Sequence, residues 1–242
     1  MKSSIMKAAV ASLAVSTVVL ATAVSCGSGS GSDSDKQDGS AQMIITGRTP
    51  LPGAKELTPR TGNFASLCKR SEEKQFSAPT TVIDPTSDYV ATITTEKGDI
   101  RIQLNPQAAP VTVNSFVFLA CSGFYEGVTF HRVITGFVAQ GGDPTGTGTG
   151  SPGYTIPDEF NDIPFSEGTL AMAKTSAANS GGSQFFICYQ FDETTEASLH
   201  GKYTIFGKVT GGMDVVKALT PRDPADNGPP GDKILAITLQ EY

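Results

Sequence analysis

From Tyr89 to the C-terminus, the chain contains short apolar runs of strand length, some of them alternating with polar residues, and turn-forming residues separate the runs. The alternating runs 91–93 and 100–104 flank the turn residues 96–99, which predicts an antiparallel hairpin. Further runs of strand length lie at 128–130, 138–141, 169–173, 184–189, 204–209 and 235–239. The 26 glycines, 15 prolines and a charged content of only 17% also favour a loop-rich β body over a helical one.

Two segments instead show helical spacing. Val113, Phe116, Val117 and Ala120 fall at i, i+3, i+4 and i+7, which predicts a helix with one apolar stripe. A second short helix is predicted at 213–219, where an aspartate in the first turn suits the helix dipole. About eight antiparallel strands and two helices are consistent with a closed β-barrel capped by two helices.

One block of the chain, residues 130–144, reads FHRVITGFVAQGGDP, and it is followed by MA at 172–173 and GSQFFI at 182–187. In residue type, order and spacing, these blocks resemble the active-site strands of the cyclophilins, the peptidyl-prolyl cis/trans isomerases. The resemblance covers roughly residues 88–242. It implies a closed eight-stranded antiparallel barrel and the isomerisation of X-Pro bonds in unfolded or extended proline-containing polypeptides.

The resemblance also assigns roles to single residues. It implies that Arg132 contacts the substrate imide and that the adjacent His131 belongs to the site and supports the arginine. It assigns the walls of the proline pocket to Phe137, Phe186 and Leu199. Since Phe185 and Phe186 are neighbours on a strand, we expect one in the core and the other in the pocket.

The remaining residues that the resemblance places against the substrate are Gln140, Ala173, Lys174, Gln184 and Tyr203. Three positions depart from well-known eukaryotic members of the family. Lys174 stands where asparagine is usual, Ser198 where tryptophan is often found, and Tyr203 where histidine is often found. The tyrosine keeps a ring and a hydroxyl donor, whereas Ser198 leaves the rim of the pocket open.

These residue types suit the reaction on physical grounds. Rotation about an X-Pro bond must break amide resonance, with a barrier of about 18–20 kcal/mol. No bond is made or broken, so the chemistry implies no cofactor and no metal. It requires a dry pocket for the ring and a donor aimed at the prolyl nitrogen, which becomes a better acceptor as the amide twists. The alternative is a non-catalytic adaptor or holdase that uses the same pocket, but the presence of Arg132 favours an enzyme.

The overall charge and the other motifs narrow the class of function. A net charge of −6 and a pI near 4.9 argue against nucleic acid as a partner. Separately, we expect the protein to be a monomer. Residues 148–153 match the dinucleotide pattern G-x-G-x-x-G by letter, but Pro152 interrupts it and no helix is expected after it. Asp158 and Glu159 are neighbours on an extended segment, so they should face apart in a solvated loop.

The N-terminal third does not resemble the isomerase. Residues 1–25 are typical of a secretory signal, with lysines before an apolar run, and small residues lead into Cys26. This pattern resembles the bacterial lipobox, so Cys26 is predicted to be lipid-modified, although an ordinary signal peptide remains an alternative. Residues 26–40 are predicted to form a flexible linker, and residues 41–87 an irregular extension. The chain is thus expected outside the cytoplasm, anchored to the outer face of the bacterial cytoplasmic membrane.

Three further cysteines follow the lipobox, which is an odd number for an oxidising compartment. Cys188 lies on a predicted strand and is most simply a buried thiol. Cys68 and Cys121 are then the candidate disulfide pair, while three free thiols are the alternative. The spacing of the cysteines shows no zinc signature.

Overall fold

The computed structural model describes residues 68–190, 192–225 and 228–242, which all lie within one unit, Ala54–Tyr242. The predicted signal segment, Cys26 and the linker lie outside these residues. In the described part of the chain, no helix is long and apolar enough to span a membrane.

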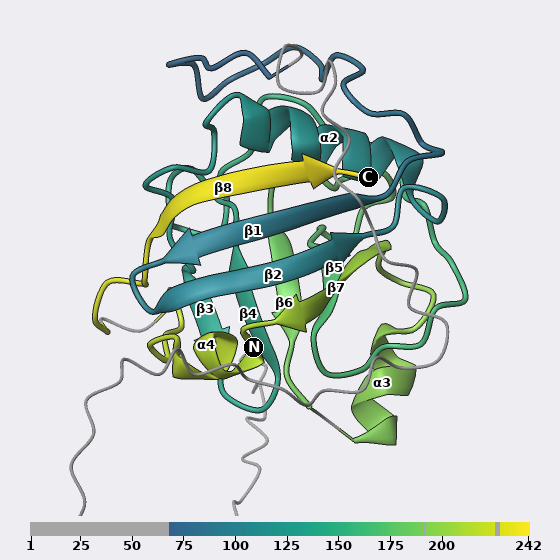
Figure 1. The fold of residues 1–242 in the computed structure, drawn as a ribbon. Coiled ribbons are helices and arrows are strands. Elements are labelled where there is room, and N and C mark those ends of the chain that lie inside the picture. Colours follow the sequence, from purple (N-terminus) through teal and green to yellow (C-terminus); the bar gives the residue numbers. More distant parts are fainter. Residues whose placement is uncertain (1–67, 191, 226–227) are drawn as a thin grey trace, which may run out of the picture. The chain divides into compact units, whose positions relative to one another are not determined.

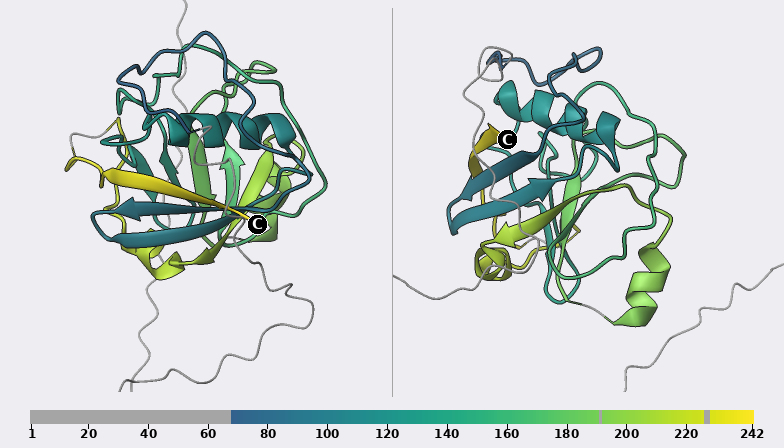
Figure 2. Two further views of the ribbon diagram at one scale, coloured as in Figure 1. Left: turned by 45° about the horizontal axis from the view of Figure 1, so that its top comes forward. Right: turned by 45° about the vertical axis from the view of Figure 1, so that its right-hand side comes forward.

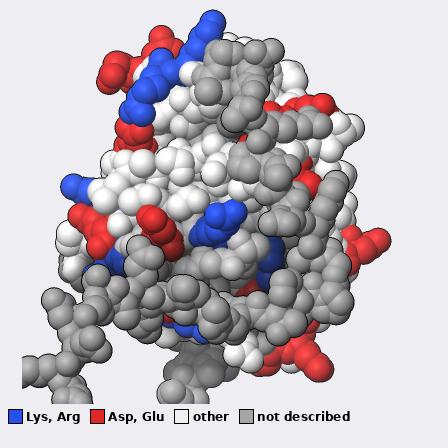
Figure 3. Space-filling view, in the orientation of Figure 1, with Lys and Arg blue, Asp and Glu red and all other residues white. Residues whose placement is uncertain are grey.

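An antiparallel sheet of eight strands forms the body of the described residues (Figure 1). The strands are β1 (Tyr89–Thr95), β2 (Gly98–Leu104), β3 (Arg132–Ile134), β4 (Val138–Gly141), β5 (Thr169–Met172), β6 (Phe185–Cys188), β7 (Ile205–Gly211) and β8 (Ile234–Glu241). Their order across the sheet is β3-β4-β6-β5-β7-β2-β1-β8. Over β8, β1 and β2, the visible face carries acidic and basic side chains in small mixed groups (Figure 3).

The expectation of a closed barrel is wrong, because the sheet is curled but open between its edge strands β3 and β8. Within the part of the chain that the structure describes, two isolated bridges lie at this gap, Thr129 to Lys233 and Val133 to Arg222. The physical reason lies in the segment before β8, where prolines occur at 221, 224, 229 and 230. Proline has no N–H to donate, so this segment cannot continue a ladder beside β3.

Among the described residues, three helices accompany the sheet: α2 (Pro110–Cys121), α3 (Glu193–Leu199) and α4 (Met213–Ala218). The views in Figures 1 and 2 show α2 and α4 at opposite ends of the curled sheet. The sequence predicted these two helices and missed α3. That short helix is capped by Asp192, whose carboxylate accepts the Thr195 N–H at 2.8 Å and so satisfies one of the helix's free donors.

The start of α2 is capped from a distant loop. Glu159 accepts the backbone N–H groups of Val111 at 3.0 Å and Thr112 at 2.8 Å, and also the Thr112 hydroxyl. A carboxylate at this end suits the helix dipole and the unsatisfied N–H groups. The expectation of a merely solvated Asp158-Glu159 loop is therefore wrong for Glu159.

The hydrophobic core is divided into two clusters. The larger fills the curl beneath α2, where the ring of Phe116 contacts Phe185 at 5.7 Å and Phe206 at 5.5 Å between centroids. The smaller cluster lies on the other face of β4 and β6 and contains Phe186 and Leu199. The adjacent Phe185 and Phe186 thus belong to different clusters, as the alternation of strand side chains requires.

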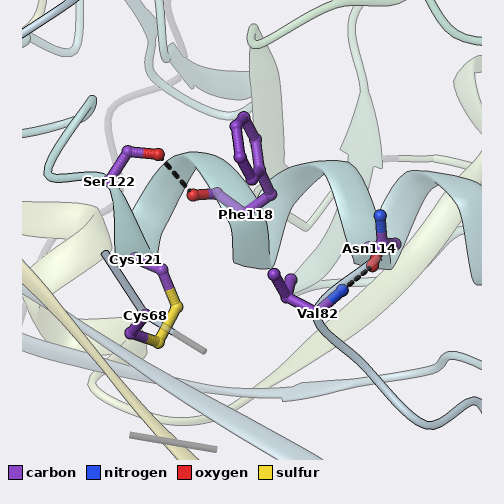
Figure 4. Close-up of a disulfide and its surroundings, with 6 residues drawn as sticks. All are labelled: Cys68, Val82, Asn114, Phe118, Cys121 and Ser122. Atoms are coloured by element: carbon purple, nitrogen blue, oxygen red, sulfur yellow. Dashed lines mark hydrogen bonds between the residues drawn. A yellow bond between two sulfur atoms is a disulfide. The ribbon is translucent and has the colours of Figure 1, made fainter. Parts of the chain in front are cut away.

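The described part of the extension, residues 68–87, forms neither helix nor strand and runs along the outer side of α2 (Figure 1). A disulfide joins Cys68 to Cys121 at the end of α2 (Figure 4). Further along, Asn114 of α2 accepts the N–H of Val82 at 2.8 Å. Cys188, in contrast, is free and buried, and burial raises the pKa of its thiol to about 12.

Because the disulfide links residues 53 positions apart, we predict that it stabilises the fold by restricting the unfolded chain. The C68A/C121A variant should lose about 2–4 kcal/mol of unfolding free energy in urea titrations. A loss below about 0.5 kcal/mol is typical of a neutral surface substitution, and it would show that the disulfide does not stabilise the fold in this way.

Candidate active site

Nine side chains from four parts of the chain surround a pocket of about 250 Å³ on the outer face of β4 and β6. They are Arg132, Phe137, Val138, Gln140, Ala173, Lys174, Phe186, Leu199 and Tyr203. All but Val138 were singled out from the sequence. Ser198 is exposed on α3 and does not line the pocket, which leaves that side of the rim without a large side chain.

Arg132 is the first residue of β3 and lies directly opposite Gln140 of β4. Its guanidinium lies over the ring of Phe137, with 5.9 Å between the guanidinium carbon and the ring centroid. Its Nε is 3.8 Å from a carboxylate oxygen of Asp223, and the Arg132 side chain is one-third exposed. A cation held on an aromatic ring at the edge of a pocket is available to donate to a bound peptide.

Aromatic and aliphatic side chains form the inner walls of the pocket. Phe186 is 5% exposed and Leu199 is 7% exposed. The ring of Tyr203 meets Phe186 edge-on, with centroids 5.3 Å apart, and Val138 is buried beside them. These contacts create an apolar recess of a size that suits a small ring.

The two predicted glutamines are joined into one hydrogen-bonded unit. Gln184 donates from Nε2 to the backbone carbonyls of Gly148 at 3.1 Å and Gly150 at 2.9 Å. Gln140 donates from its Nε2 to Oε1 of Gln184 at 3.0 Å. Because these bonds fix how each amide is turned, the Oε1 of Gln140 is left to accept a substrate N–H.

The loop that holds Gln184 is organised by Asp143, a residue that the sequence reasoning missed. Its buried carboxylate accepts the backbone N–H groups of Thr145, Thr147, Gly148 and Gly150. Burial acts to raise the pKa of Asp143, but hydrogen bonds from Thr145, Gly150 and Gly148 outweigh it and hold the pKa below its usual value. A Cβ at Gly150 would lie 2.0 Å from that carboxylate, so only glycine fits there.

Lys174 lies at the boundary between the proline pocket and a second hollow of about 330 Å³. Its ammonium is 2.5 Å from Asp158, and both side chains are 11% exposed. It also lies 5.1 Å from the centroid of the Phe160 ring. Asp158 is therefore paired within the site, and the expectation that it is solvated is wrong.

His131 is 1% exposed and does not line the pocket. Neither of its ring nitrogens makes a hydrogen bond of normal geometry in the described structure, although the nearby Thr129 backbone acts to raise the pKa. Burial is the main influence and lowers the pKa of His131, while the negative charge of Asp143 opposes it. The neutral imidazole therefore fills space behind Arg132. The other histidine, His200, is exposed after α3.

We predict that His131 makes the fold less stable in acid. Its pKa in the folded state lies below the ordinary value of 6.5, so the unfolded chain takes up a proton more readily. Its contribution to stability is complete above pH 6.5 and is lost as the pH falls toward the folded pKa. Urea unfolding at pH 7.5 and pH 5 should therefore show a larger loss of stability for the wild type than for His131→Gln. Equal losses in the two proteins would contradict this assignment.

Comparison with known proteins agrees with this geometry. Residues 89–239 match the family described as cyclophilin type peptidyl-prolyl cis-trans isomerase/CLD. A peptidyl-prolyl cis-trans isomerase of Synechococcus elongatus is 47% identical over 151 residues, which cover 62% of this chain and 94% of that protein. Peptidyl-prolyl cis-trans isomerase B of Bacillus subtilis is 49% identical over 126 residues, covering 51% and 85%.

A solved structure shows the same fold. The crystal structure of a cyclophilin-type isomerase from Cryptosporidium parvum, in the presence of the dipeptide Ala-Pro, has a TM-score of 0.56 and 35% identity. The match covers 62% of this chain and 97% of that one. The chain therefore belongs to the cyclophilin-type peptidyl-prolyl cis-trans isomerases, and its activity is the interconversion of the cis and trans forms of X-Pro bonds.

Among the described residues, no group of three or more His, Cys, Asp or Glu side chains could hold a metal ion. The acidic residues near the site have other partners. Asp158 pairs with Lys174, and Asp143 accepts hydrogen bonds from its own loop. Asp223 accepts the N–H of Ala225 at 3.0 Å while it faces Arg132.

Proposed function

We propose that the pocket between Arg132 and Phe186 is where this isomerase turns the prolyl bond, and that Arg132 supplies the main catalytic hydrogen bond. The observation that carries this proposal is the arrangement of the side chains. One cation stands at the mouth of an apolar recess, and a fixed amide stands directly opposite it on the next strand. In this assignment the proline ring enters between Phe137, Phe186 and Leu199.

The mechanism follows from how the imide changes as it rotates. In the planar ground state, the nitrogen lone pair is delocalised into the carbonyl and accepts hydrogen bonds poorly. At the twisted transition state, the lone pair is localised, so a donor from Arg132 binds the transition state more tightly than the ground state. A charge-assisted hydrogen bond of this kind contributes about 1.5–3 kcal/mol.

The rest of the acceleration has to come from holding the peptide. Uncatalysed isomerisation takes about 10–100 s, so a millisecond reaction is about four decades faster, or roughly 5.4 kcal/mol. Gln140 is fixed by Gln184 and presents an acceptor beside Arg132. A substrate gripped on the acyl side by Gln140 and on the ring side by Phe186 can rotate only about the bond between them.

The role of Arg132 leads to a contrast between two variants. Arg132→Ala should slow cis/trans exchange by about two decades, or roughly 2.7 kcal/mol of transition-state stabilisation, while peptide affinity falls much less. Phe186→Ala should mainly weaken peptide binding and stability, because it removes apolar contact. Exchange between cis and trans peptide, measured by NMR at saturating protein, separates the two effects.

If Arg132→Ala kept near-normal exchange at saturation, the arginine would be a binding residue only. Arg132→Lys is the matched control for charge. Because an ammonium lacks the planar fork of the guanidinium, the lysine variant should recover only part of the rate.

We further propose that this isomerase works outside the cytoplasm as a monomer, tethered to the outer face of a bacterial membrane. Its substrates there would be secreted or cell-surface proteins that fold after export. The support comes from the sequence alone: a signal-like segment at 1–25, Cys26 in a lipobox-like setting, and a Gly/Ser-rich linker at 26–40. The described extension would then join the linker to the isomerase.

This location is tested through Cys26. Two acyl chains on one cysteine anchor a protein stably, whereas a single chain binds a membrane only marginally. Cys26→Ser should release the protein to the medium or block its processing, as followed by membrane fractionation and mass analysis. Membrane retention of the serine variant equal to that of wild type would exclude the lipid anchor.

A further inference from the structure

Residues 68–82, here called the strap, connect α2 to the loop 148–153 beside the active site. The α2 end of the strap is held by several bonds. These are the Cys68–Cys121 disulfide, a hydrogen bond from the Ser71 N–H to the carbonyl of Ser122 at 3.0 Å, and the contacts of Lys74. The Lys74 ammonium donates to the carbonyls of Gly123 at 3.0 Å and Phe124 at 2.6 Å.

The middle of the strap reaches the loop. The backbone N–H of Phe76 donates to the carbonyl of Pro152 at 2.7 Å. Gln75 donates from Nε2 to the carbonyl of Ser151 at 2.9 Å. The two backbones run so close together that a Cβ at Gly153 would lie 2.6 Å from the carbonyl oxygen of Phe76. Gly153 also has φ +96, so this crossing requires glycine.

The position of Phe76 is set by its side chain. Its ring meets Phe118 of α2 edge-on, with centroids 5.2 Å apart, and lies 6.4 Å from the ring of Phe124. These contacts fix the backbone that donates to Pro152. Residues 75 and 76 therefore act as a bridge between a rigid helix and the loop.

The loop in turn holds the polar side of the site. Its carbonyls at Gly148 and Gly150 accept both hydrogen bonds from the Gln184 amide, and Gln184 orients Gln140. Residues 148–151 also line the second hollow, which shares Gln140, Ala173 and Lys174 with the proline pocket. Pro152 itself is buried, and a Cβ at Gly182 would lie 3.0 Å from its ring.

We infer that the strap is a positioning element for isomerisation, and that Gln75 and Phe76 act on the substrate through loop 148–153 and the Gln184–Gln140 pair. The inference rests on the proposed assignment of the pocket. Both residues lie before residue 89, where the family match begins, so the chain supports its site with a segment outside the isomerase domain. The substrate residue that occupies the second hollow should be most sensitive to the strap.

The direct test compares three single variants of the full-length protein. Phe76→Ala removes the ring that fixes the bridge, and Gln75→Ala removes one exposed hydrogen bond with little risk to folding. Arg70→Ala is the matched control, because it removes the strap's exposed ion pair with Glu126 and leaves loop 148–153 untouched. Two readouts are taken: the side-chain amide NMR signals of Gln140 and Gln184, and kcat/KM for X-Pro peptides with small or large residues before the bond.

We expect the amide signals to shift in Phe76→Ala and Gln75→Ala and to stay in place in Arg70→Ala. The value of kcat/KM should fall at least about threefold in Phe76→Ala. A misplacement of a substrate-positioning group by about 1 Å can cost about 100-fold, which sets the upper end of the expected fall. The fall in kcat/KM should differ between peptides with a small and with a large residue before the X-Pro bond. Unshifted amide signals in both bridge variants, with kcat/KM equal to that of Arg70→Ala, would overturn the inference and leave the strap a purely stabilising segment.

The test of the strap can fail or succeed independently of the assignment of Arg132 as the catalytic residue. The amide signals report on Gln184 and Gln140 without turnover, so shifts in the bridge variants support the strap even if Arg132→Ala keeps its rate. Conversely, a normal loss of rate in Arg132→Ala together with unshifted amides would retain the catalyst and reject the strap.

Discussion

The register of three short strands sets the position of every group in the site. Arg132 on β3 pairs with Gln140 on β4, and Gln140 pairs with Phe186 on β6, so these side chains form one row on one face. The next row of the same strands packs in the hydrophobic core: Val133, Ala139 and Ile187. A slip by one residue would bury the arginine and expose the core row, and burial therefore specifies the register strongly.

Two different supports keep that row in a working geometry. On the apolar side, packing around Phe186 shapes an apolar recess. On the polar side, Asp143 holds its loop, the loop holds Gln184, and Gln184 holds Gln140. The reaction breaks no bond, so orientation and a single well-placed donor account for the acceleration that is needed. A preorganised site of this kind depends on residues that never touch the substrate.

Most of the fold could be predicted because its signals are local. Short apolar runs, alternating in β1, β2 and β8, predicted the strands β1, β2 and β4 to β8, and helical spacing predicted α2. The strand predicted at 128–130 was wrong, because this segment forms only isolated bridges at Thr129 and β3 begins at Arg132. The open edge of the barrel could not be predicted, because closure depends on pairing between distant segments. Prolines in the segment before β8 prevent that pairing. The helix α3 has only seven residues, most of them polar, and therefore shows no apolar stripe. In the site, the resemblance supplied the pocket residues. Asp143, Asp223 and the partner of Lys174 were missed because their roles arise from tertiary contacts with no sequence pattern.

In the proposed site, a prolyl peptide binds across the row formed by Arg132, Gln140 and Phe186. The described residues also surround a larger cavity, of about 580 Å³, near Leu104, Ile163 and Ile205. An NMR titration of the labelled protein with a short X-Pro peptide distinguishes the two places. We predict the largest shifts at Arg132, Gln140 and Phe186, with line broadening from cis/trans exchange. Shifts confined to the larger cavity would contradict it.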